Sequence, residues 1–195
     1  FTQNYEQNAV NTFSPYVFSQ FIEFPVNQYS PVSQLDDFGL GVFGQGTVTL
    51  KEKLDLVAAL RVDYEDKNAD LKTFFDPAVA PPTVVVTEDS FSHVSPQFAV
   101  AYRFRPEYNV YATVGNGFKA GGFNPASPAG SEAYGEETTW NLEGGLKALL
   151  ANGRVAFNSA VFFIDWNDMQ LNVPNLTVPG QIYIANVGGA SSKGV

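Results

Sequence analysis

The chain contains no cysteine, one histidine and one methionine among its 195 residues. The absence of cysteine excludes a disulfide scaffold, thiolate catalysis and cysteine-ligated zinc. A single histidine, His93, leaves little for a histidine-based metal centre or for activation of a serine nucleophile, and no Gly-x-Ser-x-Gly elbow is present. We therefore expect no catalytic residues, no cofactor and no metal site.

Basic residues are also scarce, since 11 lysines and arginines stand against 20 acidic residues and give a net charge of −9. Nucleic-acid binding requires clustered lysine and arginine, so this balance argues against nucleic acid as a partner. No apolar run approaches the roughly 20 residues of a membrane-spanning helix. If the chain crosses a membrane, it has to do so as a β-barrel.

Apolar and polar residues alternate along most of the chain. Hydrophobic residues make up 45% of it and aromatic residues 14%, and they recur at a period of two between clusters of Gly, Pro, Asn and Asp. The clearest case is 54–64, where apolar side chains occupy the even positions, opposite residues such as Arg61 and Asp63. This pattern predicts an all-β fold, an antiparallel up-and-down meander.

Three hairpins are expected, with short turns inside them and long connections between them. The expected strands are 38–50 with 54–64, 91–104 with 109–119, and 134–149 with 154–171, plus a remnant at 1–7 and a last strand from Ile182. The turns are 51–53, 105–108 and Asn152-Gly153, the last a favoured turn dipeptide. The expected loops are 8–37, 65–90, 120–133 and 172–181. Long loops that alternate with short turns are typical of outer-membrane barrels, so we expect a partial segment of a transmembrane β-barrel.

The most distinctive local feature is the run from Phe118 to Asn124, which reads Phe-Lys-Ala-Gly-Gly-Phe-Asn. We expect Gly121 and Gly122 to shape the exit from the strand that ends near Phe118. Glycine permits backbone conformations that residues with a Cβ avoid, and here it is flanked by bulky rings.

An ordered series of motifs resembles the barrel domain of TonB-dependent outer-membrane receptors. The series includes 117–124, the strand 141–147, the run 162–170 and Asn186-Val187-Gly188, and it extends along nearly the whole chain. The resemblance implies that residues 1–195 are part of one barrel domain of about 22 strands with a plugged lumen. No plug domain, TonB box or terminal barrel strand is recognisable in the sequence. The family-motif residues are Phe118, Lys119, Gly121, Gly122, Phe123 and Asn124.

The same resemblance implies active transport in the outer membrane of a Gram-negative bacterium. A scarce extracellular nutrient, commonly an iron-siderophore but also cobalamin or a glycan, would bind the outer loops and enter when TonB pulls on the plug. The implied partners are outer-membrane lipid, TonB, the plug and this small ligand.

In a barrel wall the polar face of each strand meets the lumen and the apolar face meets lipid. Arginine or lysine at mid-bilayer costs about 2–4 kcal/mol, which favours an inward position for such residues. Inward charges either contact the plug, as the family implies, or hydrate the lumen and pair across strands. The expected lumen-facing residues are Arg61, Asp63, Gln97, Arg103, Asn141, Glu143, Lys147 and Asn158. The expected lipid-facing residues are Leu54, Leu56, Leu60, Val94, Phe98, Val100 and Leu142.

Aromatic residues near strand ends fit interfacial girdles or pack under loops. These residues are Tyr64, Phe104, Tyr108, Trp140 and Trp166. His93 fits a wall position better than contact with an iron chelate. Carboxylate pairs such as Asp165 with Asp168 fit solvated loops better than a cation site.

Two alternatives to an active transporter stay open from the residues alone. One is a passive porin-like channel, which would lack the ordered series of motifs. The other is a soluble β-sandwich that binds carbohydrate through its aromatic residues. A sandwich would bury Leu54, Leu56, Leu60 and Phe98 between two packed sheets.

Overall fold

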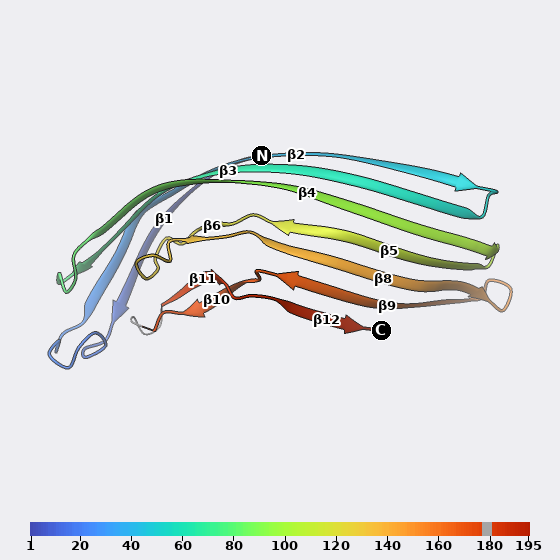
Figure 1. Cartoon of the computed structure of the whole chain (residues 1–195). Coiled ribbons are helices and arrows are strands. Elements are labelled where there is room, and N and C mark those ends of the chain that lie inside the picture. Colours follow the sequence, from blue (N-terminus) through green and yellow to red (C-terminus); the bar gives the residue numbers. More distant parts are fainter. Residues whose placement is uncertain (177–180) are drawn as a thin grey trace.

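The computed structural model describes residues 1–176 and 181–195, without the side chains of 31–33. Eight strands form one antiparallel sheet in the order β1-β2-β3-β4-β5-β8-β9-β12 (Figure 1). Their bounds are β1 (Thr2–Phe13), β2 (Val26–Leu50), β3 (Leu54–Asp76), β4 (Thr83–Arg105), β5 (Tyr108–Lys119), β8 (Glu137–Leu150), β9 (Val155–Asn167) and β12 (Ala190–Gly194).

Two further pairs of short strands lie outside this sheet. They are β6 (Gly122–Phe123) with β7 (Ala133–Tyr134), and β10 (Gln170–Pro174) with β11 (Ile182–Asn186). Among the described residues, no helix has the length and apolar character that crossing a membrane requires. The all-β antiparallel meander expected from the sequence is therefore confirmed.

Tight turns join the main strands at one end of the sheet, which we call the turn end. The turn between β2 and β3 carries positive φ angles of 50° at Lys51 and 57° at Glu52, and the turn between β8 and β9 has φ of 56° at Asn152 and 82° at Gly153. Such left-handed backbone suits the twist of antiparallel hairpins. Longer connections and the two short sheets gather at the opposite end, which we call the loop end (Figure 1).

The strands reach much further into the loop end than the sequence predicted. Residues 8–37 and 65–90 were expected to be loops, but only 14–25 and 77–82 lie between the long strands. β3 continues to Asp76 because its outer half pairs on both sides, for example Lys67 with Asp37 and with Asp89. Pairing on both edges outweighs the low strand propensity of a segment rich in Asp, Asn and Lys.

The end of the chain also differs from expectation. The strand that begins at Ile182 does not join the main sheet but pairs with β10. The main sheet ends instead at β12, where Ala190 pairs with Trp166. The strand expected at 154–171 is divided by Asp168, whose φ of 52° interrupts the extended backbone between β9 and β10.

The register divides the sheet into two faces. Paired residues lie on the same face, so Leu56, Val100 and Ala112 share one side, and Arg61, Gln97 and Asn141 share the other. We call these the apolar face and the polar face. All seven residues expected to face lipid lie on the apolar face, and all eight expected to face the lumen lie on the polar face.

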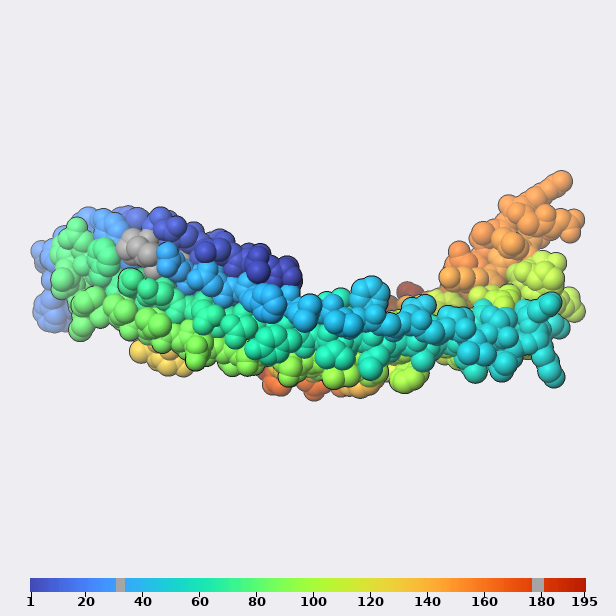
Figure 2. All heavy atoms as spheres, turned by 90° about the horizontal axis from the view of Figure 1, so that it is seen from above, coloured from blue at the N-terminus to red at the C-terminus, as the bar shows by residue number. Residues whose placement is uncertain are grey.

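The apolar face is not covered by a second sheet. Leu60 is 49% exposed, Phe98 55% and Leu142 47%. A soluble sandwich would enclose these side chains in its core, so this exposure contradicts the sandwich alternative. Figure 2 shows the same open, elongated wall in space-filling form.

The height of the apolar band fits a bilayer. On β3 the band runs from Leu54 to Tyr64, after which Asp66 and Asn68 take the same face. Ten residue steps at about 3.3 Å span about 33 Å along the strand. A strand tilt of about 40° reduces this to about 25 Å along the membrane normal, the height of the lipid-facing band in outer-membrane barrels.

Not every aromatic residue near a strand end lies on the apolar face. Trp140 does, and Tyr108 stacks on Phe104 with ring centroids 5.3 Å apart. Trp166 pairs with Thr139, which places it on the polar face, so of its two expected roles the interfacial girdle does not fit. The uninterrupted alternation of β9 from Asn158 dictates this orientation.

The main sheet forks between its turn end and its loop end. β4 and β5 pair from Arg105 and Tyr108 up to Gln97 and Gly115, and beyond that point they separate. β4 continues alongside β3 as far as Thr83, while β5 continues alongside β8. Pro96 follows the last pair, and its lack of an N–H group lets the ladder end there without leaving that donor unpaired.

Candidate functional site

The segment after β5 folds over the polar face at the loop end. Phe123 is 7% exposed and packs with Ala69 and Leu71 of β3. Leu35 and Val85 border this small core. The segment therefore lies inside the curve of the wall rather than extending it.

Asn124 fastens this segment to β11. Its Nδ2 donates to the carbonyl oxygens of Ser131 at 3.0 Å and Ile184 at 2.9 Å, and its Oδ1 accepts from the Ile184 N–H at 2.8 Å. The Asn124 N–H donates to the Glu132 carbonyl at 2.7 Å. Asn124 is only 4% exposed, so one motif residue links segments 60 positions apart.

Gly121 and Gly122 have a structural role that differs from the one predicted. Neither has a positive φ. A Cβ on Gly121 would lie 2.3 Å from the Tyr134 carbonyl oxygen and 2.5 Å from the Phe91 ring, and one on Gly122 would lie 2.7 Å from the Tyr134 hydroxyl. These glycines permit close packing at the exit from β5, rather than an unusual backbone angle.

Amide side chains also fasten the β10–β11 hairpin. Gln170 Nε2 donates to the carbonyl oxygens of Ala120 and Gly135, both at 2.9 Å. Asn186 Nδ2 donates to the Asp168 carbonyl at 2.7 Å, and its Oδ1 accepts from the Gly135 N–H at 2.6 Å. The hairpin is thus held through side-chain amides in addition to its own ladder.

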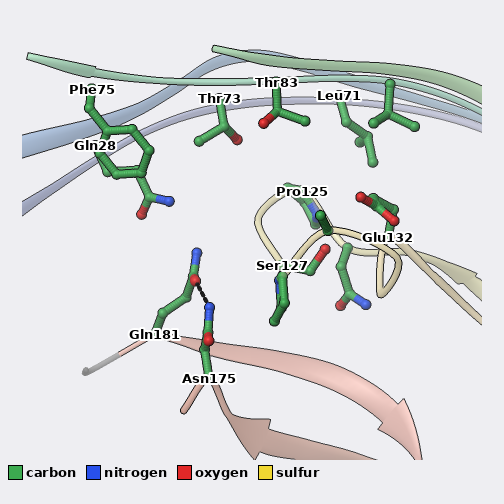
Figure 3. Close-up of a pocket in the computed structure, with 14 residues that line it drawn as sticks. Gln28, Leu71, Thr73, Phe75, Thr83, Pro125, Ser127, Glu132, Asn175 and Gln181 are labelled. Carbon is green, nitrogen blue, oxygen red and sulfur yellow. Dashed lines mark hydrogen bonds between the residues drawn. The ribbon is translucent and has the colours of Figure 1, made fainter. Parts of the chain in front are cut away.

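A cavity of about 120 Å³ lies between these fastened segments and the sheet (Figure 3). We call it the amide-lined cavity because four carboxamide side chains line it. Hydroxyl groups, a carboxylate and a few apolar side chains complete the wall. Its lining residues include Gln28, Asn124, Asn175, Gln181, Thr73, Thr83, Ser127, Glu132, Leu71, Phe75, Val85 and Pro125.

Two buried side-chain polar atoms of the lining residues have no hydrogen-bond partner among the described residues. They are the Gln181 Nε2 and the Ser127 Oγ. Gln181 is 8% exposed, and its Oε1 accepts from Asn175 Nδ2 at 2.5 Å. In Figure 3 its free amide nitrogen points across the cavity toward the wall that carries Gln28. A buried donor of this kind favours a bound acceptor.

A charged cluster lies on the polar face near the cavity. Lys67 Nζ is 3.2 Å from both Asp37 Oδ2 and Glu65 Oε2. Burial lowers the pKa of Lys67, but the two carboxylates outweigh burial and hold that pKa above its ordinary value. Burial raises the pKa of the Tyr134 phenol, with a smaller opposing effect from Lys67.

The charges of the chain are segregated between its two ends. The loop end, taken as residues 1–37, 65–92, 120–137 and 168–189, carries 14 of the 20 acidic residues but only two of the 11 basic ones. Those two, Lys67 and Lys72, are both ion-paired. The acidic residues are Glu6, Glu23, Asp36, Asp37, Glu65, Asp66, Asp70, Asp76, Glu88, Asp89, Glu132, Glu136, Glu137 and Asp168.

Charged residues on the polar face pair mainly with one another. Arg61 Nε donates to Asp63 at 2.7 Å, and Arg103 forms an ion pair with Asp55 of the neighbouring strand. Tyr111 donates to Glu143 at 2.6 Å. Such pairing is what the hydration-and-pairing interpretation of these residues requires.

His93 contacts other residues of the wall. Its ring stacks on Phe118 with centroids 4.6 Å apart, and its Nε2 lies 2.6 Å from Asn116 Oδ1. Within the described part of the chain, no group of three or more His, Cys, Asp or Glu residues is arranged to hold a metal ion.

Of the residues that build the candidate site, the sequence motifs include the Phe118–Asn124 run, Gln170 and Asn186, but without the contacts that these residues make. Gln28, Asn175 and Gln181 were missed, since isolated amide residues in polar segments carry no recognisable spacing. The eight expected polar-face residues line the wall nearer the turn end and do not border the amide-lined cavity.

One apolar face of bilayer height and one polar face define the wall of an outer-membrane-type β-barrel. A family model described as "TonB dependent receptor-like, beta-barrel" matches residues 1–195. The chain therefore belongs to the TonB-dependent receptor-like β-barrel family, whose members are receptors and transporters rather than enzymes.

Solved receptors share this architecture. The ferric yersiniabactin uptake receptor FyuA of Yersinia pestis matches with a TM-score of 0.71 and 20% identity, over 88% of this chain and 25% of that one. The ferric-catecholate import receptor Fiu of E. coli K12 matches with a TM-score of 0.57 and 15% identity, over 99% and 30%. The alcaligin outer-membrane receptor FauA of Bordetella pertussis gives 0.52 and 15%, over 99% and 34%. The chain thus spans about a third or less of these structures, and the likeness establishes the fold.

Proposed function

We propose that the complete protein is an outer-membrane receptor of a Gram-negative bacterium that imports a scarce extracellular compound, such as an iron-siderophore, with energy supplied through TonB. The family match over residues 1–195 is the observation that supports this proposal. Two of the similar solved structures are described as an uptake and an import receptor for ferric compounds.

Residues 1–195 serve, in this proposal, as part of one barrel domain. Eight strands are too few to enclose a plug domain, whereas barrels of about 22 strands hold one. The plug and the TonB contact are supplied by other parts of the protein. Arg61, Asp63, Gln97 and Arg103 face the lumen, and so do Asn141, Glu143, Lys147 and Asn158.

Transport in cells tests the proposal. A strain that lacks the complete receptor gene is compared with the same strain carrying it, under iron limitation, for accumulation of radiolabelled ferric-siderophore complexes. We expect the gene to restore accumulation and deletion of TonB to abolish it. Accumulation that persists without TonB would instead support a passive porin-like channel.

A further inference from the structure

The amide-lined cavity offers hydrogen bonds without positive charge. Gln181 Nε2 and Ser127 Oγ are free to bind, and the single charged lining residue is the acidic Glu132. Its Oε2 accepts from the Gly130 N–H at 2.8 Å, which leaves lone pairs on that carboxylate for a further donor. The cavity therefore combines free donors with a free acceptor.

The surroundings are unfavourable for an anion. The two basic residues of the loop end, Lys67 and Lys72, are already paired with Asp37, Glu65 and Asp70. No unpaired cation is thus present in the described part of the loop end. The excess of carboxylates around it produces a negative potential that repels anionic ligands before contact.

We propose that the amide-lined cavity binds an uncharged group of the transported compound, one that carries hydroxyl or amide functions, and that it selects against anionic compounds. This inference rests on the proposed import function. A hydroxyl group accepts from Gln181 Nε2 and donates to Glu132, whereas a carboxylate or a catecholate oxygen only accepts and is repelled by Glu132.

The size of the cavity agrees with one small group rather than a whole chelate. A volume of about 120 Å³ is close to that of an engineered cavity of about 150 Å³ that accepts benzene. Leu71, Phe75 and Val85 supply apolar surface for the carbon skeleton of such a group. This mixture of apolar wall and a few directed polar groups is usual for small-molecule sites.

Binding to the purified full-length receptor tests the assignment by titration calorimetry. The probes are maltotriose and a neutral ferric trihydroxamate, as two sources of uncharged hydroxyl or amide groups, and the trianionic ferric tris-catecholate. We expect at least one neutral probe to bind and the trianion not to bind. Binding of maltotriose would identify a sugar as the source of the uncharged group, and binding of the ferric trihydroxamate would identify a hydroxamate.

Substitutions in the cavity test whether the probes bind there. Gln181→Glu removes the free donor and adds a negative charge, so we expect neutral-probe affinity to fall about tenfold or more. Glu132→Gln should reduce the discrimination against the trianion. Glu88→Gln is the matched control, because Glu88 belongs to the same end but its strand position places it on the other face. Its affinities should equal those of the wild type.

The assignment is overturned if neither neutral probe binds, or if Gln181→Glu binds a neutral probe as tightly as the wild type does. TonB-dependent uptake of the tris-catecholate through this receptor would overturn it while leaving the import function intact. Binding of a neutral probe that is weakened by Gln181→Glu, without TonB-dependent uptake of that probe, would overturn the import function while supporting the preference of the cavity for uncharged groups.

Discussion

Asn124 provides the sharpest test of how the loop end is held together. Its side chain makes three hydrogen bonds, to Ser131 and to both backbone groups of Ile184, at 2.8–3.0 Å. A net value of about 1 kcal/mol per bond gives a loss of about 3 kcal/mol for Asn124→Ala. Truncation also leaves the Ile184 groups without their partner, so this figure is a minimum for the local loss.

Amide hydrogen exchange of the full-length receptor measures this loss directly. If Ile184 exchanges by local opening, about 3 kcal/mol corresponds to roughly a hundredfold faster exchange at its N–H. Asn124→Asp keeps an acceptor for that N–H but sets a carboxylate oxygen against the carbonyl oxygens of Ser131 and Ile184, so it should lose protection at least as strongly as Asn124→Ala. Asn4→Ala, on an exposed residue of β1, is the matched control and should leave exchange unchanged. Unchanged protection of Ile184 in Asn124→Ala would refute the role of Asn124.

Three further outcomes are expected of the full-length receptor. Replacing Gly121 and Gly122 by valine should reduce assembly in the membrane, because the Cβ of residue 121 would lie 2.3 Å from a backbone oxygen. Assembly is measured as the folded fraction at the cell surface, and normal assembly would contradict the close-packing argument. Phe98→Arg on the apolar face should cost about 2–4 kcal/mol in a folding titration, whereas Gln97→Arg on the polar face should be tolerated, and equal costs would contradict the assignment of faces. The pKa of Lys67 is raised, so its ion pairs stabilise the loop end fully below the ordinary lysine pKa of about 10.4. This stabilisation is lost as pH rises through the pKa of Lys67 in the folded state. Hydrogen exchange at the loop end, followed during an alkaline titration, should show the loss in the wild type and not in Lys67→Met.

The faces of the sheet were predictable because alternation is a local property. The run from Leu54 to Tyr64 assigns its own two sides whatever its neighbours are, and the register confirms that assignment. The outer half of β3 was not predictable in the same way. Asp66, Asn68 and Asp70 resemble loop residues by composition, and only pairing with β2 and β4 makes them strand.

The candidate site depended on contacts that no local pattern encodes. Gln28 and Gln181 are distant in sequence and line one cavity because the segments after β5 and after β9 both lie against the sheet there. The motif at Gly121 and Gly122 was recognised, but its physical reason became apparent only from Tyr134 and Phe91. Sequence identifies the glycines, whereas tertiary packing explains them.

The fork between β4 and β5 places the walls of the amide-lined cavity on two separate branches of the sheet. Thr73 and Thr83 belong to the branch of β3 and β4, while Asn124 and Gln181 belong to the segments that follow β5 and β9. Any change in the angle between the branches changes the distance across the cavity. A ligand that contacts both walls therefore favours one angle, and by reciprocity a force that alters the angle alters the affinity. The fork therefore couples the ligand affinity of the cavity to the angle between the two branches of the sheet.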